Sequence, residues 1–407
     1  MSLIVQKFGG TSVGTTDLIR NVANRIKLYY EQGHDVVVAV SAMGKSTDAL
    51  VELAARIHDR PSPREMDVLL STGEQVTIAL LAMALDSIGV PARSFTGGQV
   101  GMLTNENNSE ARILDIEADR LRTALANRQV CIVAGFQGVD KNGNITTLGR
   151  GGSDTTAVAL AAALKADSCE IYTDVDGVYT TDPNKVISAR KISYISYEEM
   201  LELARLGAGV LHSRSVEMAS RFKVKLHVRS SFNNAQGTMV VAEEDVMEKV
   251  QVRGVTLKTD ESRVSVAQIP DRPGLAALLF GRLADAQVNV DVIVQSTGTD
   301  GKNTISFTVP HKDLLQTRQV VNDFIQEMGA GALDVNEHIA IVSAVGIGMR
   351  SHSGIAAVLF KALADLDINI EMISTSEIKI SVVVHKDQGK KALEAVHSAF
   401  DLDKPPA

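Results

Sequence analysis

An arginine flanked by glycines is the most specific chemical feature of this 407-residue sequence. It lies in the segment TTLGRGGSDTT, residues 146–156. Glycines on both sides of Arg150 would let the backbone come close to a ligand. The guanidinium is suited to a bidentate grip on a carboxylate or a phosphate. A helix cap would explain Ser153 and Asp154 at the start of the small-residue stretch that follows, but it would not explain the arginine. We therefore predict a site for a charged ligand here.

A second segment, KFGGTSVG (7–14), follows the apolar run LIVQ. Backbone N–H groups at a turn through Gly9 and Gly10, and at the helix start that follows, would attract anions. Lys7 would add a point charge for a phosphate. No Walker A pattern is present. A purely structural glycine turn explains this motif equally well when it is taken alone.

Two further motifs also have structural explanations. SAMGKSTDAL (41–50) offers Ser41 and Thr47 at a strand-turn-helix junction, although capping of the helix by Ser46 or Thr47 explains it as well. STGEQVTIALL (71–81) is predicted to open an apolar helix. There Glu74 would be a first-turn acid that interacts with the helix dipole. Its alternative role is to face the ammonium group of a ligand.

The segment IYTDVDGVYTTDP (171–183) combines a strand with turn-forming residues. Stacked turns explain it, and so does a loop that closes over a nucleotide with Tyr179 against the base. His212, His227 and the other histidines show no metal-ligand spacing, so we predict no metal site in the protein. A carboxylate nucleophile fits this absence, because its ordinary pKa of about 3.9 leaves it ionised at pH 7 without a general base. Phosphoryl transfer to such an acceptor needs mainly positioning and charge neutralisation.

The elements that would position these motifs alternate along the first 240 residues. β-Branched runs (LIVQKF, DVVVAVS, VCIVAGF, CEIYTDV, KLHVRSS) are separated by stretches with helical spacing. Such alternation predicts a mostly parallel sheet covered by helices on both faces. Ligands bind at the carboxyl ends of the strands of such sheets, and the glycine-rich and charged motifs follow directly after the predicted strands.

An internal repeat follows a polar linker at 243–250. Residues 273–293 align without gaps on residues 353–373, and ten of the 21 positions are identical. Each copy has the pattern of a βαββα unit, which predicts two small ferredoxin-like modules after the large α/β domain.

Composition narrows the classes of partner. The formal net charge is −8 and no basic cluster is present, which argues against nucleic acid or an anionic membrane as partners. Cys131 and Cys169 lie in apolar runs and are predicted to be buried, reduced thiols. No signal peptide is recognisable, and the apolar run at 76–85 is too short to span a bilayer. We therefore expect a cytoplasmic protein.

Taken together and in this order, the motifs resemble those of aspartate kinases, which belong to the amino acid kinase superfamily. VLHSRSVE (210–217) completes the series, and the repeat resembles the paired ACT domains of feedback-regulated members. The resemblance implies a three-layer αβα kinase domain over 1–245 and ACT domains over 263–335 and 336–407, with the strand 250–262 joining the second ACT domain.

The resemblance implies transfer of the γ-phosphoryl group of MgATP to the β-carboxylate of L-aspartate, which gives 4-phospho-L-aspartate. Lys7 and Asp154 would be catalytic, with Asp154 orienting the lysine. The implied aspartate-binding residues are Thr47, Glu74, Arg150 and Ser153. The implied nucleotide-binding residues are Lys7, Gly9, Gly10, Ser41, Thr173, Asp174, Tyr179 and Asp182.

Regulation by lysine, threonine or both is also implied, through effector-binding positions Asp271, Asp291 and Gln295. A strand-end acid in contact with solvent is the alternative interpretation of Asp291. The family suggests a homodimer or an α2β2 oligomer built through the ACT domains. Met247 lies where some relatives begin a separate small subunit.

Two departures from the family pattern weaken the implied contacts with ATP. Gly209 stands where relatives carry lysine or arginine, and Asn184 stands where they often carry arginine, although Lys185 follows it. These departures keep two alternatives open. One is a catalytically weakened ACT-based amino-acid sensor or regulatory subunit, and the other is a kinase for another amino-acid carboxylate.

Overall fold

The computed structural model describes residues 1–207, 209–246, 251–298 and 301–404, which form two compact units. The first unit comprises Met1–Val178, Lys191–Arg205 and Gly209–Glu248. The second comprises the remaining described segments, including Tyr179–Arg190. Met247, where a separate small subunit was considered, lies outside the described residues.

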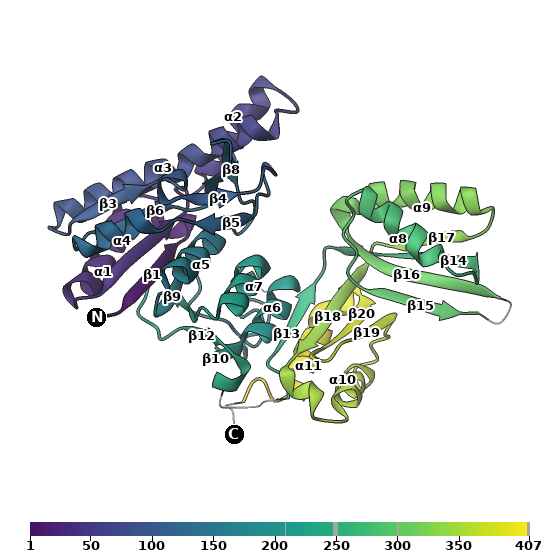
Figure 1. Cartoon of the computed structure of the whole chain (residues 1–407). Coiled ribbons are helices and arrows are strands. Elements are labelled where there is room, and N and C mark those ends of the chain that lie inside the picture. Colours follow the sequence, from purple (N-terminus) through teal and green to yellow (C-terminus); the bar gives the residue numbers. More distant parts are fainter. Residues whose placement is uncertain (208, 247–250, 299–300, 405–407) are drawn as a thin grey trace. The chain divides into compact units, whose positions relative to one another are not determined.

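An eight-stranded sheet forms the centre of the first unit (Figure 1), in the order β10-β12-β11-β9-β1-β2-β6-β3. Only β11 and β12 pair antiparallel; the other neighbours are parallel. The predicted mostly parallel sheet is thus confirmed. The strands are β1 (Leu3–Phe8), β2 (Asp35–Val40), β3 (Ala92–Phe95), β6 (Val130–Ala134), β9 (Ser168–Thr173), β10 (Tyr194–Ser196), β11 (Leu226–Ser230) and β12 (Thr238–Val241).

Helices cover both faces of this sheet, which explains why its central strands are almost continuously apolar. One face packs against α1 (Thr16–Glu31) and α3 (Pro63–Ser87), in a core that includes Val38 and Ile132. The other layer contains α4 (Asp119–Ala126) and α5 (Gly152–Leu164). The remaining helices of the unit are α2 (Ser46–Ile57), α6 (Tyr197–Arg205) and α7 (Ser213–Phe222), with the 3₁₀ turns η1 (Gly10–Val13), η2 (Gly98–Val100) and η3 (Glu243–Asp245).

A smaller sheet of four short strands completes this unit, in the order β5-β4-β7-β8. Its strands are β4 (Met102–Thr104), β5 (Ile113–Ile116), β7 (Gln137–Val139) and β8 (Ile145–Thr147). The β7–β8 hairpin carries the chain from the end of β6 to the arginine–glycine segment, so this sheet is part of the support of the predicted site.

Helix α3 begins earlier than the sequence indicated. It starts at Pro63, after Ser62 accepts a hydrogen bond from the Glu65 amide. The prediction that residues 71–81 open the helix is therefore wrong. The letters STGE have the spacing of a capping box but lie inside the helix, so Glu74 is not a first-turn acid.

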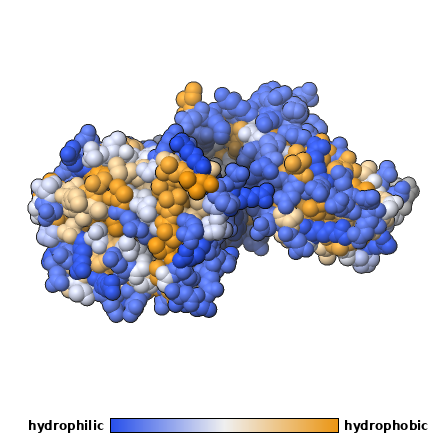
Figure 2. Space-filling model, turned by 90° about the horizontal axis from the view of Figure 1, so that it is seen from above, coloured by the Kyte–Doolittle hydropathy of each residue, from blue (hydrophilic) through white to orange (hydrophobic). Residues whose placement is uncertain are grey.

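By length and composition α3 also meets the criteria for a membrane-spanning helix, although the run 76–85 alone was judged too short. Ile78, Leu81 and Leu85 are buried in the core that α3 forms with the sheet, and core helices of this kind meet the same criteria. Val76 and Met83 on the same helix are exposed. Figure 2 shows hydrophobic patches between hydrophilic areas on the face seen from above.

The second unit contains two four-stranded antiparallel sheets, each with two helices. The first sheet has the order β15-β16-β14-β17 and the second β13-β18-β20-β19. The elements of the first module are β14 (Glu261–Pro270), α8 (Leu275–Asp285), β15 (Ile293–Thr297), β16 (Lys302–Pro310), η4 (His311–Asp313), α9 (Leu314–Met328) and β17 (Ala332–Asn336). The elements of the second module are β13 (Gly254–Lys258), β18 (Ile339–Val345), η5 (Ile347–Arg350), α10 (Ile355–Ala364), β19 (Met372–Thr375), β20 (Lys379–His385), η6 (Lys386–Gln388) and α11 (Gly389–Ala399).

The segment Tyr179–Arg190 packs against the second of these modules. Thr180 shares a 2.9 Å hydrogen bond with Nε2 of the buried His397, and the Thr180 carbonyl accepts from the Val255 amide. The Arg190 guanidinium donates to the Leu402 carbonyl. Val186 lies in the apolar core of the module. This segment is therefore held by β13 and by the region of α11.

Candidate functional site

The sequence motifs converge because parallel strands present their carboxyl ends at one edge of a sheet. Neighbouring strands β11, β9, β1, β2 and β6 run in parallel, with Lys7 of β1 opposite Ala39 on one side and Ile171 on the other. The loops that follow these five strands therefore leave the sheet side by side. This edge carries the glycine turn after β1, Ser41 after β2, the segment GFQG after β6, Thr173 at the end of β9, and Ser230 and Ser231 at the end of β11.

Lys7 and Asp154 meet at this edge. Lys7 Nζ lies 2.7 Å from an Asp154 carboxylate oxygen, and each side chain is 12% exposed. The ammonium also lies beside Gly9, where an added Cβ would be 3.2 Å from Nζ. The carboxylate thus holds the lysine ammonium beside the glycine turn.

The turn after β1 contacts the turn after β2. The Gly44 amide donates to the Gly10 carbonyl at 3.1 Å, and the Ser41 amide donates to the Phe8 carbonyl at 3.1 Å. Ser12 in η1 shares a 2.5 Å hydrogen bond with Ser231 after β11. These contacts join the turns that follow β1, β2 and β11, which are called the rim of the site below.

Glu74 comes to this rim from α3. It is only 3% exposed, and its Oε1 accepts from the Ala42 amide at 3.1 Å. Burial raises the pKa of the Glu74 carboxyl to about 7, against the opposing effect of hydrogen bonds from backbone amides. Its second oxygen is buried and has no hydrogen-bond partner among the described residues. A buried acceptor without a partner indicates a place for a donor.

Helix α2, also after β2, begins without a side-chain cap. Its N-cap is Lys45, and the Ser46 hydroxyl donates to the Met43 carbonyl instead. Capping by Ser46 or Thr47 is therefore wrong. Thr47 lies half-buried in the first turn of α2.

The arginine–glycine segment adopts a turn with left-handed backbone on both sides of Arg150, with φ of 74° at Gly149 and 69° at Gly151. The Arg150 side chain is exposed and forms no hydrogen bond or ion pair with the residues that the structure describes. Helix α5 begins at Gly152 with Gly151 as its N-cap and no side-chain cap, so capping by Ser153 or Asp154 is wrong. Ser153 follows in its first turn beside Gly135, where an added Cβ would lie 2.7 Å from Ser153 Oγ.

The predicted nucleotide-binding residues divide between the two units. Thr173 ends β9 and donates to the exposed Asp174. Tyr179 and Asp182 belong to the second unit. Asp182 pairs with Lys185 at 3.1 Å and accepts from the Asn184 amide. Burial acts to raise the pKa of Asp182, but these contacts outweigh it and the pKa is lowered.

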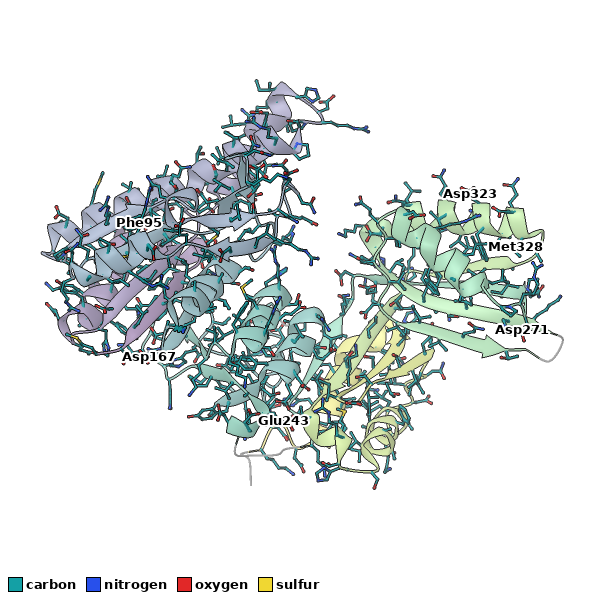
Figure 3. All side chains as sticks on the ribbon, viewed as in Figure 1. Phe95, Asp167, Glu243, Asp271, Asp323 and Met328 are labelled. Atoms are coloured by element: carbon teal, nitrogen blue, oxygen red, sulfur yellow. The ribbon has the colours of Figure 1, made fainter. Side chains whose placement is uncertain are left out.

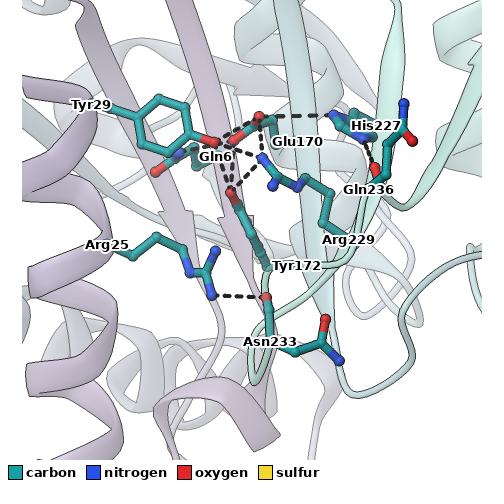
Figure 4. A network of polar contacts seen from close by, with 9 residues as sticks. All are labelled: Gln6, Arg25, Tyr29, Glu170, Tyr172, His227, Arg229, Asn233 and Gln236. Carbon is teal, nitrogen blue, oxygen red and sulfur yellow. Dashed lines mark hydrogen bonds and ion pairs between the residues drawn. The ribbon is translucent and has the colours of Figure 1, made fainter. Parts of the chain in front are cut away.

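A buried polar network beneath the rim was not recognised in the sequence (Figure 4). Glu170 in β9 is 5% exposed and accepts hydrogen bonds from Gln6, Tyr29 and Tyr172. Arg229 of β11 adds an ion pair at 3.3 Å. Burial, together with the Glu170 charge, raises the pKa of the Tyr172 phenol. The network joins β1, β9, β11 and α1, so it fixes the strands that carry Lys7, Thr173 and Ser231.

Asp67 is a second buried acid that the sequence analysis missed. It is fully buried in α3 and accepts hydrogen bonds from Asn108, Ser109 and Thr147. Its spacing from Ser71 and Glu74 places all three on one face of the helix. A charged residue on the buried face of an apolar helix was the signal that pointed to it.

The predicted effector residues lie in the first module of the second unit. Asp271, labelled in Figure 3, follows β14 and accepts from Asn303 at 2.8 Å. Gln295 is exposed on β15. Asp291 is not simply a solvated acid, because Lys258 Nζ lies 3.6 Å from its carboxylate and also pairs with the fully buried Glu261. Burial acts to lower the pKa of Lys258, but the two acids outweigh it and the pKa is raised.

Glu371 occupies the position of Asp291 in the second copy of the repeat and is paired in a similar way. Arg263 of β14 lies 3.2 Å from its carboxylate. Each acid is thus neutralised by a basic residue from a strand of the other module, since Lys258 ends β13 and Arg263 lies in β14. The apolar cluster of Val292, Ile339, Ile341, Met372 and Val383 packs between the same elements.

Both cysteines are buried and unpaired, and burial raises the pKa of the Cys131 thiol to about 12. Within the described residues, no group of three or more His, Cys, Asp or Glu side chains is arranged to hold a metal ion.

Comparison with known proteins agrees with this geometry. Residues 2–230 match the amino acid kinase family, and residues 264–323 and 342–400 each match the ACT domain. An aspartate kinase of Stutzerimonas stutzeri is 52% identical over 406 residues, which are 100% of this chain and 98% of that one. Aspartokinase 2 of Bacillus subtilis is 51% identical over 407 residues and 100% of both chains.

Among solved structures, E. coli aspartokinase III in complex with aspartate and ADP superposes with a TM-score of 0.80 at 27% identity, covering 98% of this chain and 99% of that one. Aspartate kinase from Synechocystis gives a TM-score of 0.56 at 48% identity, covering 100% of this chain and 70% of that one. The chain therefore belongs to the amino acid kinase family and, with its two ACT domains, to the aspartate kinases within it.

Proposed function

We propose that this chain transfers the γ-phosphoryl group of ATP to the β-carboxylate of L-aspartate, which gives 4-phospho-L-aspartate and ADP. One observation carries the proposal. The motifs around one sheet edge supply three charged groups. They are a lysine paired with a carboxylate, an arginine without a partner among the described residues, and a buried acid with one oxygen that accepts no hydrogen bond. An amino acid offers a carboxylate for the arginine and an ammonium for the acid.

In this proposal each group has one task. Arg150 binds the α-carboxylate in a bidentate manner, a geometry to which guanidinium is suited. Glu74 receives the substrate ammonium on its open oxygen, while Ser153 and Thr47 contribute hydroxyls to the same pocket. The β-carboxylate needs no general base, because it is ionised at neutral pH. The rate then depends on in-line positioning and on neutralising the charge of the transferring group.

Lys7 supplies that neutralisation in this proposal, and Asp154 fixes its ammonium above the turn at Gly9. Amides of Gly9 and Gly10, with Ser41, would hold phosphate oxygens. Thr173, Asp174, Tyr179 and Asp182 would bind the rest of the nucleotide. Mg²⁺ would be bound to the ATP phosphates and would add positive charge there. It is usually held by phosphates and only one or two carboxylates, so the site needs no cluster of carboxylates to accept it.

Regulation would act through the ACT domains, with lysine, threonine or both as effectors near Asp271, Asp291 and Gln295. Large apolar side chains of both modules are exposed, including Ile293 in the first and Ile373 in the second. We propose that they are covered in a homodimer or an α2β2-type oligomer. We expect the protein to work in the cytoplasm.

The direct test is ADP release from MgATP and L-aspartate in the presence of hydroxylamine, which traps an acyl phosphate as a hydroxamate. Aspartate-dependent hydroxamate that decreases when lysine and threonine are added supports the whole proposal. L-Glutamate in place of L-aspartate tests the kinase for another amino acid. Effector binding by calorimetry without any hydroxamate favours instead a regulatory protein whose kinase site is disabled. Gly209 motivates that second candidate.

A further inference from the structure

The backbone that leads to Arg150 is held at every residue from 147 to 149. The Thr147 amide donates to Asp67 and the Thr147 carbonyl accepts from Ala111. The Leu148 amide donates to Phe136, and the Gly149 carbonyl accepts from Gly152. The arginine therefore extends from a fixed stem, although its own side chain has no partner in the part of the chain that the structure describes.

Two charged side chains from different elements, the fully buried Asp67 and the half-buried Arg214, hold this stem. Asp67 of α3 accepts the Thr147 hydroxyl at 2.6 Å and the Thr147 amide at 3.1 Å. Arg214 of α7 donates to the Leu148 carbonyl at 2.7 Å and to the Ala111 carbonyl at 2.6 Å. Burial lowers the pKa of Arg214, but an arginine keeps its charge at physiological pH.

The same face of α3 also reaches the neighbouring loops of the site. The Ser71 carbonyl, one turn after Asp67, accepts from the Gln137 side chain, and Glu74 accepts from the Ala42 amide. One helix thus contacts the arginine stem, the start of β7 and the loop after β2. Spacing between the two groups that would grip the substrate, Arg150 and Glu74, depends on this helix.

We infer that Asp67 is a positioning residue that sets the distance between the carboxylate-binding arginine and the ammonium-binding glutamate. The inference rests on the proposed aspartate kinase activity and concerns a residue that touches no substrate. A displacement of about 1 Å in a positioning group can reduce rates by orders of magnitude. Loss of the clamp therefore acts on aspartate, whose two charged ends are gripped by these loops, more than on ATP.

A matched pair in β8 tests this directly. Thr146 and Thr147 are adjacent, and each is 1% exposed. The Thr147 hydroxyl binds Asp67, whereas the Thr146 hydroxyl shares a 2.6 Å hydrogen bond with Thr104. Thr147→Val and Thr146→Val each remove one buried hydroxyl hydrogen bond while the side-chain volume is kept. Only the first touches the clamp.

The experiment measures KM for aspartate, KM for ATP, kcat and the midpoint of thermal unfolding for wild type, both threonine variants and Asp67→Asn. We expect Thr147→Val and Asp67→Asn to raise KM for aspartate about tenfold or more, with KM for ATP nearly unchanged. Thr146→Val should lower the midpoint of thermal unfolding by about as much as Thr147→Val does, but it should keep wild-type kinetics. If Asp67→Asn does not fold, the threonine pair still decides.

Two results would overturn the inference, and they differ from a failure of the proposed function. Equal kinetic effects of Thr147→Val and Thr146→Val would mean that the contact is only structural. Parallel rises in both KM values would mean that the whole edge is disturbed. A wild-type protein that forms no aspartyl hydroxamate would refute the proposed function itself, and the positioning role with it.

Discussion

Replacing Gly151 by alanine should weaken aspartate binding in addition to lowering stability. An alanine Cβ at this position would lie 2.2 Å from His212 Cβ and 2.3 Å from its Cγ. Such an overlap forces His212 or the start of α5 to move, and overpacking of this kind costs about 1–3 kcal/mol. The left-handed φ of 69° adds about 1–2 kcal/mol for any residue with a Cβ. Because Arg150 is the preceding residue, we expect the displacement to reach the substrate.

Gly143→Ala is the matched control. Gly143 has a φ of 80°, but an added Cβ would meet no atom within 4 Å. This variant carries the backbone cost without the overlap. Stability would be measured by urea unfolding, and KM for each substrate by ADP release. We expect Gly143→Ala to lose about 1–2 kcal/mol of stability with wild-type kinetics, and Gly151→Ala to lose about 2–5 kcal/mol with a KM for aspartate raised tenfold or more. Identical kinetics for the two variants would refute the reasoning.

Three further predictions concern charged groups. The raised pKa of Glu74, about 7, means that the folded state holds a proton that the unfolded state releases above its ordinary pKa, so this group lowers stability as pH rises from about 4.5 to 7. Glu74→Gln should therefore raise the free energy of unfolding by up to about 3 kcal/mol at pH 8 and not at all near pH 4. In the wild type, kcat/KM for aspartate should rise near pH 7 as Glu74 ionises, and the variant should lack this rise. A wild-type kcat/KM that is constant between pH 6 and 8 would contradict this. Gly209 has a φ of 68°, so Gly209→Lys should be compared with Gly209→Ala, which has the same backbone strain without the charge. Only the lysine variant should raise kcat/KM for ATP, by as much as 10²–10³ where about 2–4 kcal/mol of phosphate contact is restored. Equal kcat/KM values for the two variants would show that no phosphate contact is missing at this position. Lys258→Met combined with Glu261→Gln removes the partner of Asp291 without leaving a buried charge unpaired. A lower effector concentration should then inhibit the enzyme. An unchanged inhibition curve would show that Asp291 does not receive the effector ammonium.

The sheet and its binding edge could be predicted because local patterns determine them. The five apolar runs identified in the sequence became β1, β2, β6, β9 and β11. Their parallel order places the motifs together by a general rule of such sheets. The internal repeat predicted the two ACT modules for a similar reason, because each copy supplies most of the strands and helices around one apolar core. The remaining strand of the second module, β13, comes from before the repeat.

What the sequence did not show depends on contacts between residues far apart in the chain. Asp67 binds Thr147 across 80 positions, and Glu170 binds Gln6 across 164. Neither acid has a local motif, so only its unusual place in an apolar stretch could have drawn notice. STGE misled for the opposite reason. It has the local spacing of a helix start, but the strand–helix packing around it continues the helix on both sides.

The attachment of Tyr179–Arg190 to the second module has a consequence for biosynthesis on the ribosome. His397, the partner of Thr180, is 217 residues further along the chain. At a translation rate of about 5–20 residues per second, Thr180 waits roughly 10–40 s before that histidine is made. During this interval the strands around Lys7 can already assemble, whereas the segment with Tyr179 and Asp182 has no core to receive Val186. In a nascent chain the loops proposed to bind aspartate can therefore form before the segment proposed to bind the nucleotide is held in place, because that segment packs against β13 and α11, which are made later.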